Sequence, residues 1–285
     1  MKNTLIILGV LATVFFAACD VVEAPYLDSD KPVWNGRKIL LLDFTGHTCG
    51  NCPGAHQTIE SLIENLDGAI VPIAVHCGYF SVVYTTNVNQ PYHYDFRNPV
   101  SLELGGNGFS DYGYFGIQSQ PIGVVNWLVP EALSAHDAWG AAAAEYFSLF
   151  PELLIEGTAV FNETDSMVNA QIEVSASMAS TRNLHLAVYI TESHILQWQT
   201  DYTQNPSNVQ DYEHNHVLRG SFNGTWGDVI NSDNANIIRN QEFSKSYSLK
   251  IANDWNSQNL SVVAFVYDSD TKEVLQAEEI HVTLP

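Results

Sequence analysis

Residues 39–76 carry the pattern that most limits how this chain can fold. Residues 39–44 (ILLLDF) form an apolar run interrupted only by Asp43, which is typical of a strand buried on both faces in a parallel sheet. Apolar residues then recur at helical spacing from Ala55 to Leu66, and residues 70–76 (IVPIAVH) form a second buried run. A strand, a helix and a strand in this order predict a βαβ unit, so we expect an α/β first half.

The sequence after this unit predicts a long insertion, followed by another strand and a helix. Residues 78–118 are rich in Tyr, Asn and Gly and only weakly periodic, so we expect an insertion with one helix. Segments of that length usually form lids or binding surfaces. Residues 123–127 (GVVNW) predict a further strand. Residues 138–150 predict a helix that follows a capping box at 134–137 and ends at Pro151.

The second half of the chain consists of short β-rich segments separated by Asn, Asp, Ser and Gly. The predicted strands cover residues 168–175, 184–191, 217–222, 243–251, 260–268 and 279–284. Strands without intervening helices predict an antiparallel β-sandwich, and we place the boundary between the halves at residues 151–157. All four cysteines precede this boundary, so the sandwich lacks the intersheet disulfide of antibody domains.

The N-terminus has the features of an export signal. Residues 5–18 are apolar, too short to span a bilayer but of the length of a signal-peptide core. Ala17-Ala18-Cys19 resembles a bacterial lipobox, in which the cysteine becomes the lipidated first residue. We therefore expect a signal peptide over residues 1–18, lipidation at Cys19 and a polar tether over 19–36, with plain secretion as the alternative.

The net charge of the chain limits the classes of partner that it can bind. It has 11 Lys and Arg against 32 Asp and Glu, which gives a net charge of -21 at pH 7. Nucleic acids and anionic membrane surfaces are bound through Lys and Arg, which are scarce here. We expect no nucleic-acid partner, and contact with a membrane only through the lipid anchor.

The motif Cys49-Gly50-Asn51-Cys52 lies between the first buried strand and the amphipathic helix. Unpaired N–H groups at a helix N-terminus stabilise a thiolate and lower the pKa of the first cysteine. Cys49 is therefore the expected exposed, attacking thiolate, and Cys52 the resolving thiol. Export to an oxidising compartment permits a disulfide between them.

The segment ILLLDFTGHTCGNCPGAH resembles the active-site strand and helix of thioredoxins. By this resemblance Asp43 matches the buried acid that helps to deprotonate the resolving cysteine. Gln120-Pro121 matches the cis-proline loop that faces the disulfide and docks substrate backbone. Two residues depart from the thioredoxin pattern. Thr48 stands where a Trp precedes the first cysteine, and Asn51 replaces the Pro or His that helps to set the redox potential.

The whole chain, from the lipobox through HTCGNCPG to HNHVLRG and TWGD, resembles the outer-membrane lipoprotein family named outer membrane protein twenty-eight. The resemblance implies an α/β thioredoxin-like domain over residues 37–152, with the insertion at 78–118. An all-β immunoglobulin-like sandwich would follow over residues 153–285. The resemblance also implies an exported lipoprotein of the outer membrane, facing either the periplasm or the cell surface.

Histidines and a third cysteine surround the predicted site. His47 precedes the motif, and His76 and Cys77 end the second buried strand, on the side of a parallel sheet where ligands bind. Cys77 is a packed core thiol in one interpretation. In the other, the motif cysteines join His47, His76 and Cys77 in a soft-metal cluster. His214 and His216 form a second metal-binding pair if they lie in a strand, and a solvated junction if they do not.

The leading functional hypothesis is thiol–disulfide exchange without a cofactor. Cys49 attacks a protein thiol or disulfide partner, and Cys52 resolves the mixed disulfide. Asp43 assists proton transfer, and Pro121 positions the partner. The oligomeric state is not predicted.

The alternative hypothesis is a non-enzymatic cell-surface protein whose disulfide is structural and which binds an extracellular ligand. Its binding surface would be the sandwich and the insertion, because tyrosines provide amphipathic contact area. The insertion holds Tyr79, Tyr84, Tyr92, Tyr94, Tyr112 and Tyr114. The same tyrosines equally suit a packed lid over the sheet. Copper or zinc handling is a third, weaker hypothesis.

Overall fold

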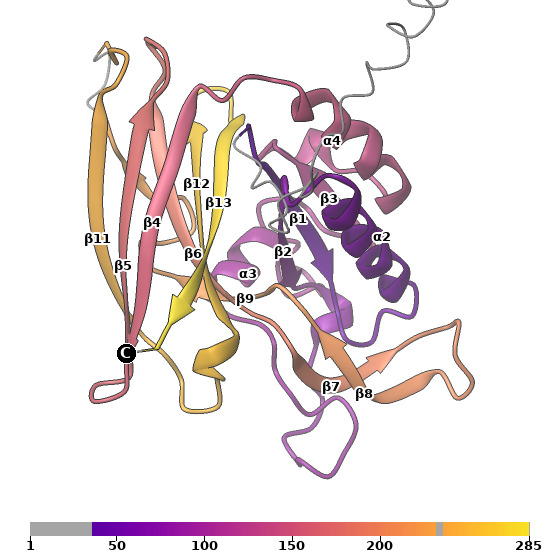
Figure 1. Ribbon diagram of the computed structural model, residues 1–285. Helices are drawn as coiled ribbons and strands as arrows, with labels where there is room; N and C mark the ends of the chain where they lie inside the picture. The colour runs from indigo at the N-terminus through magenta and orange to yellow at the C-terminus, as the bar shows by residue number, and fades with distance from the viewer. Residues whose placement is uncertain (1–35, 232–235, 285) are drawn as a thin grey trace, which may run out of the picture. The chain divides into compact units, whose positions relative to one another are not determined.

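A computed structural model describes residues 36–231 and 236–284 of the chain (Figure 1). Its central strand is β1 (Ile39–Thr45), all seven residues of which are buried. β1 pairs in parallel with β2 (Ile70–His76) and antiparallel with β3 (Ile122–Val125). The helix α2 (Cys52–Asn65) connects β1 to β2, so the βαβ unit predicted from residues 39–76 is present.

The two faces of β1 contribute to two different cores. Ile39 and Leu41 pack with α2 and with α4 (Trp139–Phe147), which lie together on one face of these strands (Figure 1). Leu40, Leu42 and Phe44 point to the opposite face, where α3 (Pro99–Gly105) packs. Successive residues of a strand point to opposite faces, so a strand covered by helices on both sides must be almost entirely apolar.

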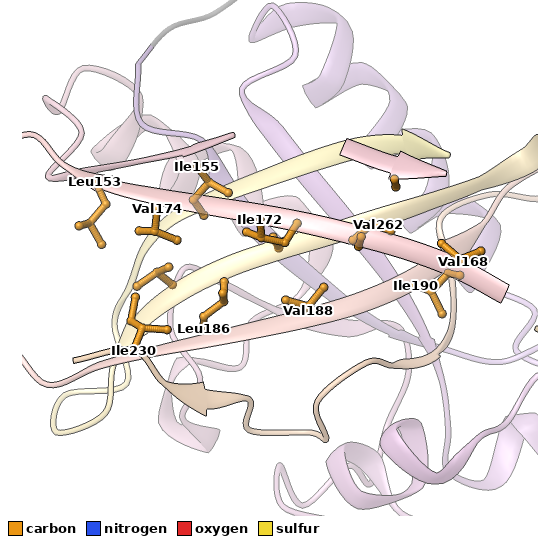
Figure 2. Close-up of a cluster of buried hydrophobic side chains, with 14 of the residues drawn as sticks. Leu153, Ile155, Val168, Ile172, Val174, Leu186, Val188, Ile190, Ile230 and Val262 are labelled. Carbon is orange, nitrogen blue, oxygen red and sulfur yellow. The ribbon is translucent and has the colours of Figure 1, made fainter. Parts of the chain in front are cut away.

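The second half of the chain is built from β-strands. They are β4 (Leu153–Asn162), β5 (Met167–Ala176), β6 (Leu184–Glu192), β9 (Val217–Ser221), β10 (Asp228–Val229), β11 (Glu242–Lys250), β12 (Leu260–Asp268) and β13 (Val274–Thr283). Buried and exposed residues alternate along β5, as expected for a strand with one solvated face. Aliphatic side chains of β4 and β5 interdigitate with those of β6 and β12 to form one core (Figure 2).

The strands of both halves belong to one sheet, in the order β11-β5-β4-β13-β12-β6-β9-β2-β1-β3. β13 pairs with both β12 and β4, and β9 meets β2 at the pair Val217 and Ala74. The second faces of β6 and β12 share a core with β1 and β2. All described residues fall within one compact unit. The fold is therefore a mixed α/β structure around a large sheet, and the expected split into two domains near residues 151–157 is not confirmed.

Two parts of the sheet region were not predicted. The strand β4 covers the region assigned to the boundary. A two-stranded hairpin of β7 (Ile195–Thr200) and β8 (Asn208–His214) occupies a stretch without predicted structure. Much of the hairpin is exposed, and an exposed hairpin does not require a regular apolar face. Its sequence therefore lacks the alternation of apolar and polar residues that marks a half-buried strand.

The helices differ from expectation mainly at their ends. The predicted helix 138–150 is shorter, as α4 ends at Phe147, and the predicted capping box at 134–137 is wrong because Ala138 occupies the N-cap without a side-chain bond. The capping box lies instead on α3, the one helix expected in the insertion, where Asn98 and Ser101 bond each other's backbone N–H groups.

Within residues 36–231 and 236–284, no helix is both long and apolar enough to cross a membrane. The predicted signal peptide, Cys19 and most of the tether lie outside the described residues.

The shared cores predict that both halves unfold together. Leu186 of β6 is fully buried (Figure 2), so Leu186→Ala should lower the free energy of unfolding by about 2–5 kcal/mol. Denaturation followed by tryptophan fluorescence and by far-UV circular dichroism should give coincident, shifted transitions. Leu196 is 59% exposed, so Leu196→Ala serves as the control and should stay within about 0.5 kcal/mol of the parent protein. Two transitions, of which only one shifts, would show that the halves unfold independently.

Candidate functional site

The end of β1 and the start of α2 form a tight loop that carries the cysteine motif. Gly46 lies so close to the Phe80 backbone that a Cβ would come within 2.5 Å of the Phe80 carbonyl carbon. Thr48 donates its backbone N–H and its hydroxyl to the Phe80 carbonyl, at 3.0 and 2.9 Å. Pro53 lies in the first turn of α2, where a missing N–H leaves no helix bond unmade. These contacts fix the motif at the carboxyl end of β1.

Cys49 and Cys52 form a disulfide at the N-terminus of α2. The S–S distance is 2.13 Å and the Cα atoms are 5.4 Å apart. The disulfide expected from the motif is present, but the exposure expected of Cys49 is not. Cys49 is only 2% exposed, and Cys52 is fully buried.

The β7–β8 hairpin covers the motif loop. Gln199 donates from its side-chain Nε2 to the carbonyl oxygen of Cys49 at 2.9 Å, and the backbone N–H of Thr200 donates to the His47 carbonyl at 2.8 Å. The N–H of Tyr202 donates to the Gly50 carbonyl at 3.0 Å, and its ring leaves no room for a Cβ on Gly50. The residues that shield Cys49 thus come from a segment about 150 positions later in the chain.

Asp43 is a buried carboxyl on the face of β1 toward α2. It shares this face with Ile39 and Leu41, and neither of its oxygens has a hydrogen-bond partner. Burial raises the pKa of Asp43 from 3.8 to about 8, because an ionised carboxylate loses its hydration there. Asp43 therefore holds its proton at neutral pH in the disulfide form.

His56 lies beside Asp43, with its Nε2 atom 3.6 Å from the Oδ2 atom of Asp43. It belongs to α2, one helical turn after Cys52, so both side chains lie on the same helix face. Its Nδ1 atom bonds the hydroxyl of Tyr212 at 2.7 Å, and its Nε2 atom bonds the hydroxyl of Thr45 at 3.1 Å. Burial, and to a lesser extent the charge of His216, lowers the pKa of His56 to about 4.

A cleft of about 500 Å³ opens between α2, β2 and β8 on the outer side of His56. His56 and Tyr212 line it, together with Glu60, Glu64, Glu213 and His216. The cleft gives solvent access to the same imidazole whose other side faces the buried carboxyl.

Three more histidines gather around Phe96, near the motif. The His76 ring stacks on Phe96 with centroids 4.3 Å apart, and the His214 ring lies 4.6 Å from Phe96 and 5.5 Å from His76. His47 lies 6.0 Å from Phe96. Burial lowers the pKa of His47 to about 4, that of His214 to about 3, and that of His76 well below its ordinary value.

The two metal-binding sets considered as alternatives find no support in the described part of the chain. Among the described residues, no group of three or more His, Cys, Asp or Glu side chains could hold a metal ion. His214 ends β8 and is buried against Phe96, whereas His216 follows the strand with a positive φ of 55°. The two do not share one strand face, and His214 is not the solvated residue expected at a loop junction.

Cys77 and Gln120 contact each other at the carboxyl ends of β1 and β2. The Cys77 thiol is buried against Gly105 in the core under α3, and burial raises its pKa. The Gln120 side chain donates to the carbonyl oxygens of Thr45 at 2.7 Å and Cys77 at 3.1 Å. The peptide bond from Gln120 to Pro121 is cis, and it leads directly into β3.

The tyrosines of the insertion divide into two groups. Tyr92 donates to Asn208 and shares a hydrogen bond with Thr200, while Tyr94 donates to Asp254 and accepts from Arg219. This pair ties the insertion to later parts of the chain, as expected of a packed lid. Tyr79, Tyr84 and Tyr112 are between 39% and 70% exposed, as expected of a recognition surface. Tyr114 is 41% exposed, but its hydroxyl donates to the Leu128 carbonyl and its ring packs on Trp226.

Sequence reasoning missed His56, Gln199 and Tyr212. His56 could have been found, because its spacing of four residues from Cys52 on an amphipathic helix places both on one face. No local pattern marks Gln199 or Tyr212, because their roles depend on the fold of a distant hairpin.

Comparisons with known proteins give one family match and solved structures with which the chain can be compared. A family model described as outer membrane protein Omp28 matches residues 110–283. The solved structure of HBP35 of Porphyromonas gingivalis is similar over 87% of this chain and 76% of that one, with 17% identity and a TM-score of 0.60. A crystal structure of a domain of the outer membrane lipoprotein Omp28 from Porphyromonas gingivalis covers 47% of this chain and 90% of that one, with 19% identity and a TM-score of 0.32. No curated protein matches the sequence.

The raised pKa of Asp43 predicts a pH-dependent stability. Between the ordinary pKa of 3.8 and about 8, the unfolded chain releases a proton that the folded protein keeps, so stability falls as pH rises. Asp43→Asn should remove this effect. The free energy of unfolding of the oxidised variant, minus that of the parent protein, should therefore increase as pH rises from 5 to 7. The increase should be up to about 1.4 kcal/mol per pH unit.

Urea denaturation at several pH values measures this difference. Asp111→Asn, in the exposed part of the insertion, is the matched control and should show a constant difference. A constant difference for Asp43→Asn as well would mean that Asp43 is already ionised in the folded protein.

Proposed function

Since this chain belongs to the Omp28 family of outer membrane proteins, we propose that it acts there as a thiol–disulfide exchange protein. Cys49 is the attacking thiol, Cys52 the resolving thiol, and Asp43 the group that takes the proton from Cys52. The partner is a protein thiol or disulfide that reaches the motif loop.

One observation carries this proposal: a buried carboxyl without hydrogen-bond partners lies beside His56, one turn after Cys52 on the helix that bears the disulfide. An isolated buried carboxyl destabilises a fold, because its charged form loses hydration and its neutral form leaves polar atoms unpaired. Such groups with raised pKa values are concentrated at sites of proton transfer. An apolar side chain would suit the packing of β1 at position 43 better than an acid. Deprotonation of Cys52, in contrast, requires a proton acceptor, and Asp43 can be that group.

The arrangement of the chain supports the finer parts of the proposal. A central strand, a cysteine pair at a helix N-terminus and a third strand that follows Pro121 are the elements of a thioredoxin-like unit, which we assign to residues 37–152. The strands of residues 153–285 form the immunoglobulin-like part. We assign the membrane attachment to a lipid on Cys19, with the tether leading to β1.

Exchange requires the β7–β8 hairpin to move. Cys49 is nearly inaccessible while Gln199, Thr200 and Tyr202 bond the motif loop. The attacking sulfur of a partner must approach in line with the disulfide, so the hairpin contacts must open before a mixed disulfide forms. The hairpin thereby selects partners that can displace it.

A second candidate function rests on the same shielding. If the hairpin never opens, the disulfide is structural and the protein is a binding module of the outer membrane. The exposed side chains of Tyr79, Phe109 and Tyr112 then supply its contact surface.

A redox titration separates the two functions. The mature protein, with thiols trapped by alkylation and counted by mass, should show a midpoint between about -120 and -270 mV, as in known exchange proteins. Cys49→Ser should abolish dithiol exchange, whereas Cys77→Ala should leave the midpoint unchanged, because Cys77 lies in another core. A midpoint below about -300 mV would identify a structural disulfide and favour the binding module.

The shielding predicts that weakening the hairpin contacts speeds reduction. Gln199→Ala removes the side-chain bonds to Cys49 and Gly46, each worth about 1 kcal/mol, so the rate of reduction by a small thiol should rise about thirtyfold. Gln197→Ala, two residues earlier on β7, is the matched control and should leave the rate unchanged. Equal rates in all three proteins would show that the hairpin does not limit access.

A further inference from the structure

The buried acid and the solvent cleft are connected through one side chain. Asp43 has no hydrogen bond of its own, and the only ion-pair partner found for it among the described residues is His56 at 3.6 Å. A proton that reaches Asp43 from Cys52 must leave again before the next cycle. The structure therefore raises the question of where that proton goes.

The His56 ring spans the distance between the acid and the cleft. Its Nε2 atom is on the Asp43 side, where it also bonds Thr45, and its Nδ1 atom bonds the Tyr212 hydroxyl on the cleft side. The side chain of His56 is one-fifth exposed, whereas that of Asp43 is fully buried. An imidazole with one nitrogen at each end of a path can accept a proton on one and release a proton from the other.

The other buried histidines do not offer this path. His47, His76 and His214 surround Phe96, and among the described residues none of them forms an ion pair or a hydrogen bond with Asp43. Nε2 of His47 and Nδ1 of His76 have no hydrogen-bond partner, so these rings do not continue a chain of hydrogen bonds.

We propose that His56 is the positioning residue through which Asp43 exchanges its proton with solvent, along the path Asp43, His56, Tyr212 and the cleft between α2 and β8. The proposal rests on the proposed thiol–disulfide exchange, because it explains how the acid of that reaction is reset.

The step balances in protons and electrons. The Cys49 thiolate attacks a partner disulfide, which forms a mixed disulfide and releases one partner thiolate. Asp43 first loses its own proton to His56 along the same path, so that its carboxylate can accept the proton of Cys52. The Cys52 thiolate then attacks Sγ of Cys49, which releases the second partner thiolate. The protein dithiol is oxidised and the partner disulfide is reduced. Asp43 then passes the proton to Nε2 of His56, and a proton leaves from Nδ1 to the Tyr212 side of the cleft.

Several titratable groups from the neighbouring elements face His56. They are Asp43 on β1, Glu60 on α2, His76 on β2, Tyr212 and His214 on β8, and His216 after β8. Burial lowers the pKa of His76 and of His214, so both are neutral at pH 7 and do not compete as cations for the Asp43 carboxylate. Glu60 lines the cleft, and its Oε1 atom lies 3.9 Å from Nε2 of His216.

The test uses the mature, reduced full-length protein and a coloured aromatic disulfide as the partner. The first aromatic thiolate reports attack by Cys49, and the second reports resolution by Cys52. His56→Gln should leave the first release unchanged and slow the second about tenfold or more at neutral pH, as expected when a proton-transfer group is lost. The difference should shrink as pH rises, because hydroxide then removes the proton.

Chemical rescue distinguishes proton transfer from a purely structural role. In His56→Ala, added imidazole should enter the cleft and restore the second release in proportion to its concentration, without affecting the first. His136→Gln is the matched control, because His136 also bonds an α2 side chain, Thr58, but does not face Asp43. It should behave like the parent protein in both releases and show no response to imidazole.

The outcomes separate a failure of the proposed exchange function from a failure of the proton path through His56. A parent protein that releases no thiolate would overturn the proposed exchange function and this path with it. A parent protein that releases both, together with His56 variants that release the second at the parent rate, would overturn the path alone. If neither variant folds, nitrogen-15 chemical shifts of His56 in the parent protein replace the kinetics. In a pH titration, these shifts should change with the same midpoint as the chemical shift of the Asp43 carboxyl carbon. Nitrogen shifts of His56 that do not change with pH would refute the path.

Discussion

The burial of β1 on both faces is the constraint on which the rest of the structure depends. Its seven residues lie between α2 and α4 on one side and α3 on the other, so the chain can reach the surface only at the ends of the strand. The cysteine motif occupies the carboxyl end, where a helix N-terminus begins. The same burial leaves both oxygens of Asp43 without a hydrogen bond among the described residues, with Nε2 of His56 at 3.6 Å, and such burial is costly for a carboxyl group.

The β7–β8 hairpin connects two aspects of the site that are separate in the sequence. Gln199 on β7 bonds the motif loop at Cys49, whereas Tyr212 on β8 bonds His56 and borders the cleft. A movement of this hairpin therefore changes both the exposure of the disulfide and the surroundings of the imidazole. In the proposed exchange reaction, access for a partner and release of a proton depend on one element.

Local sequence patterns predicted much of the fold. The apolar runs at 39–44 and 70–76 became β1 and β2, and residues 260–268 became β12 with the same bounds, because long apolar runs are stable in few environments. The hairpin and β4 escaped prediction for opposite reasons. The hairpin is too polar to show a periodic pattern, and β4 lay where a change in texture suggested a linker. The separation into two domains is not confirmed, because β6 and β12 bury both faces, one toward each half.

The sequence by itself determined that a cysteine pair lies at a strand-to-helix junction, since spacing and hydrophobicity act over a few residues, and the resemblance to thioredoxins added the buried acid at Asp43. Only the tertiary structure decided that the pair is covered, that His56 faces Asp43, and that Tyr212 connects this imidazole to a cleft. These contacts join residues up to about 150 positions apart, where the packing of whole elements, and not local propensity, sets the distance.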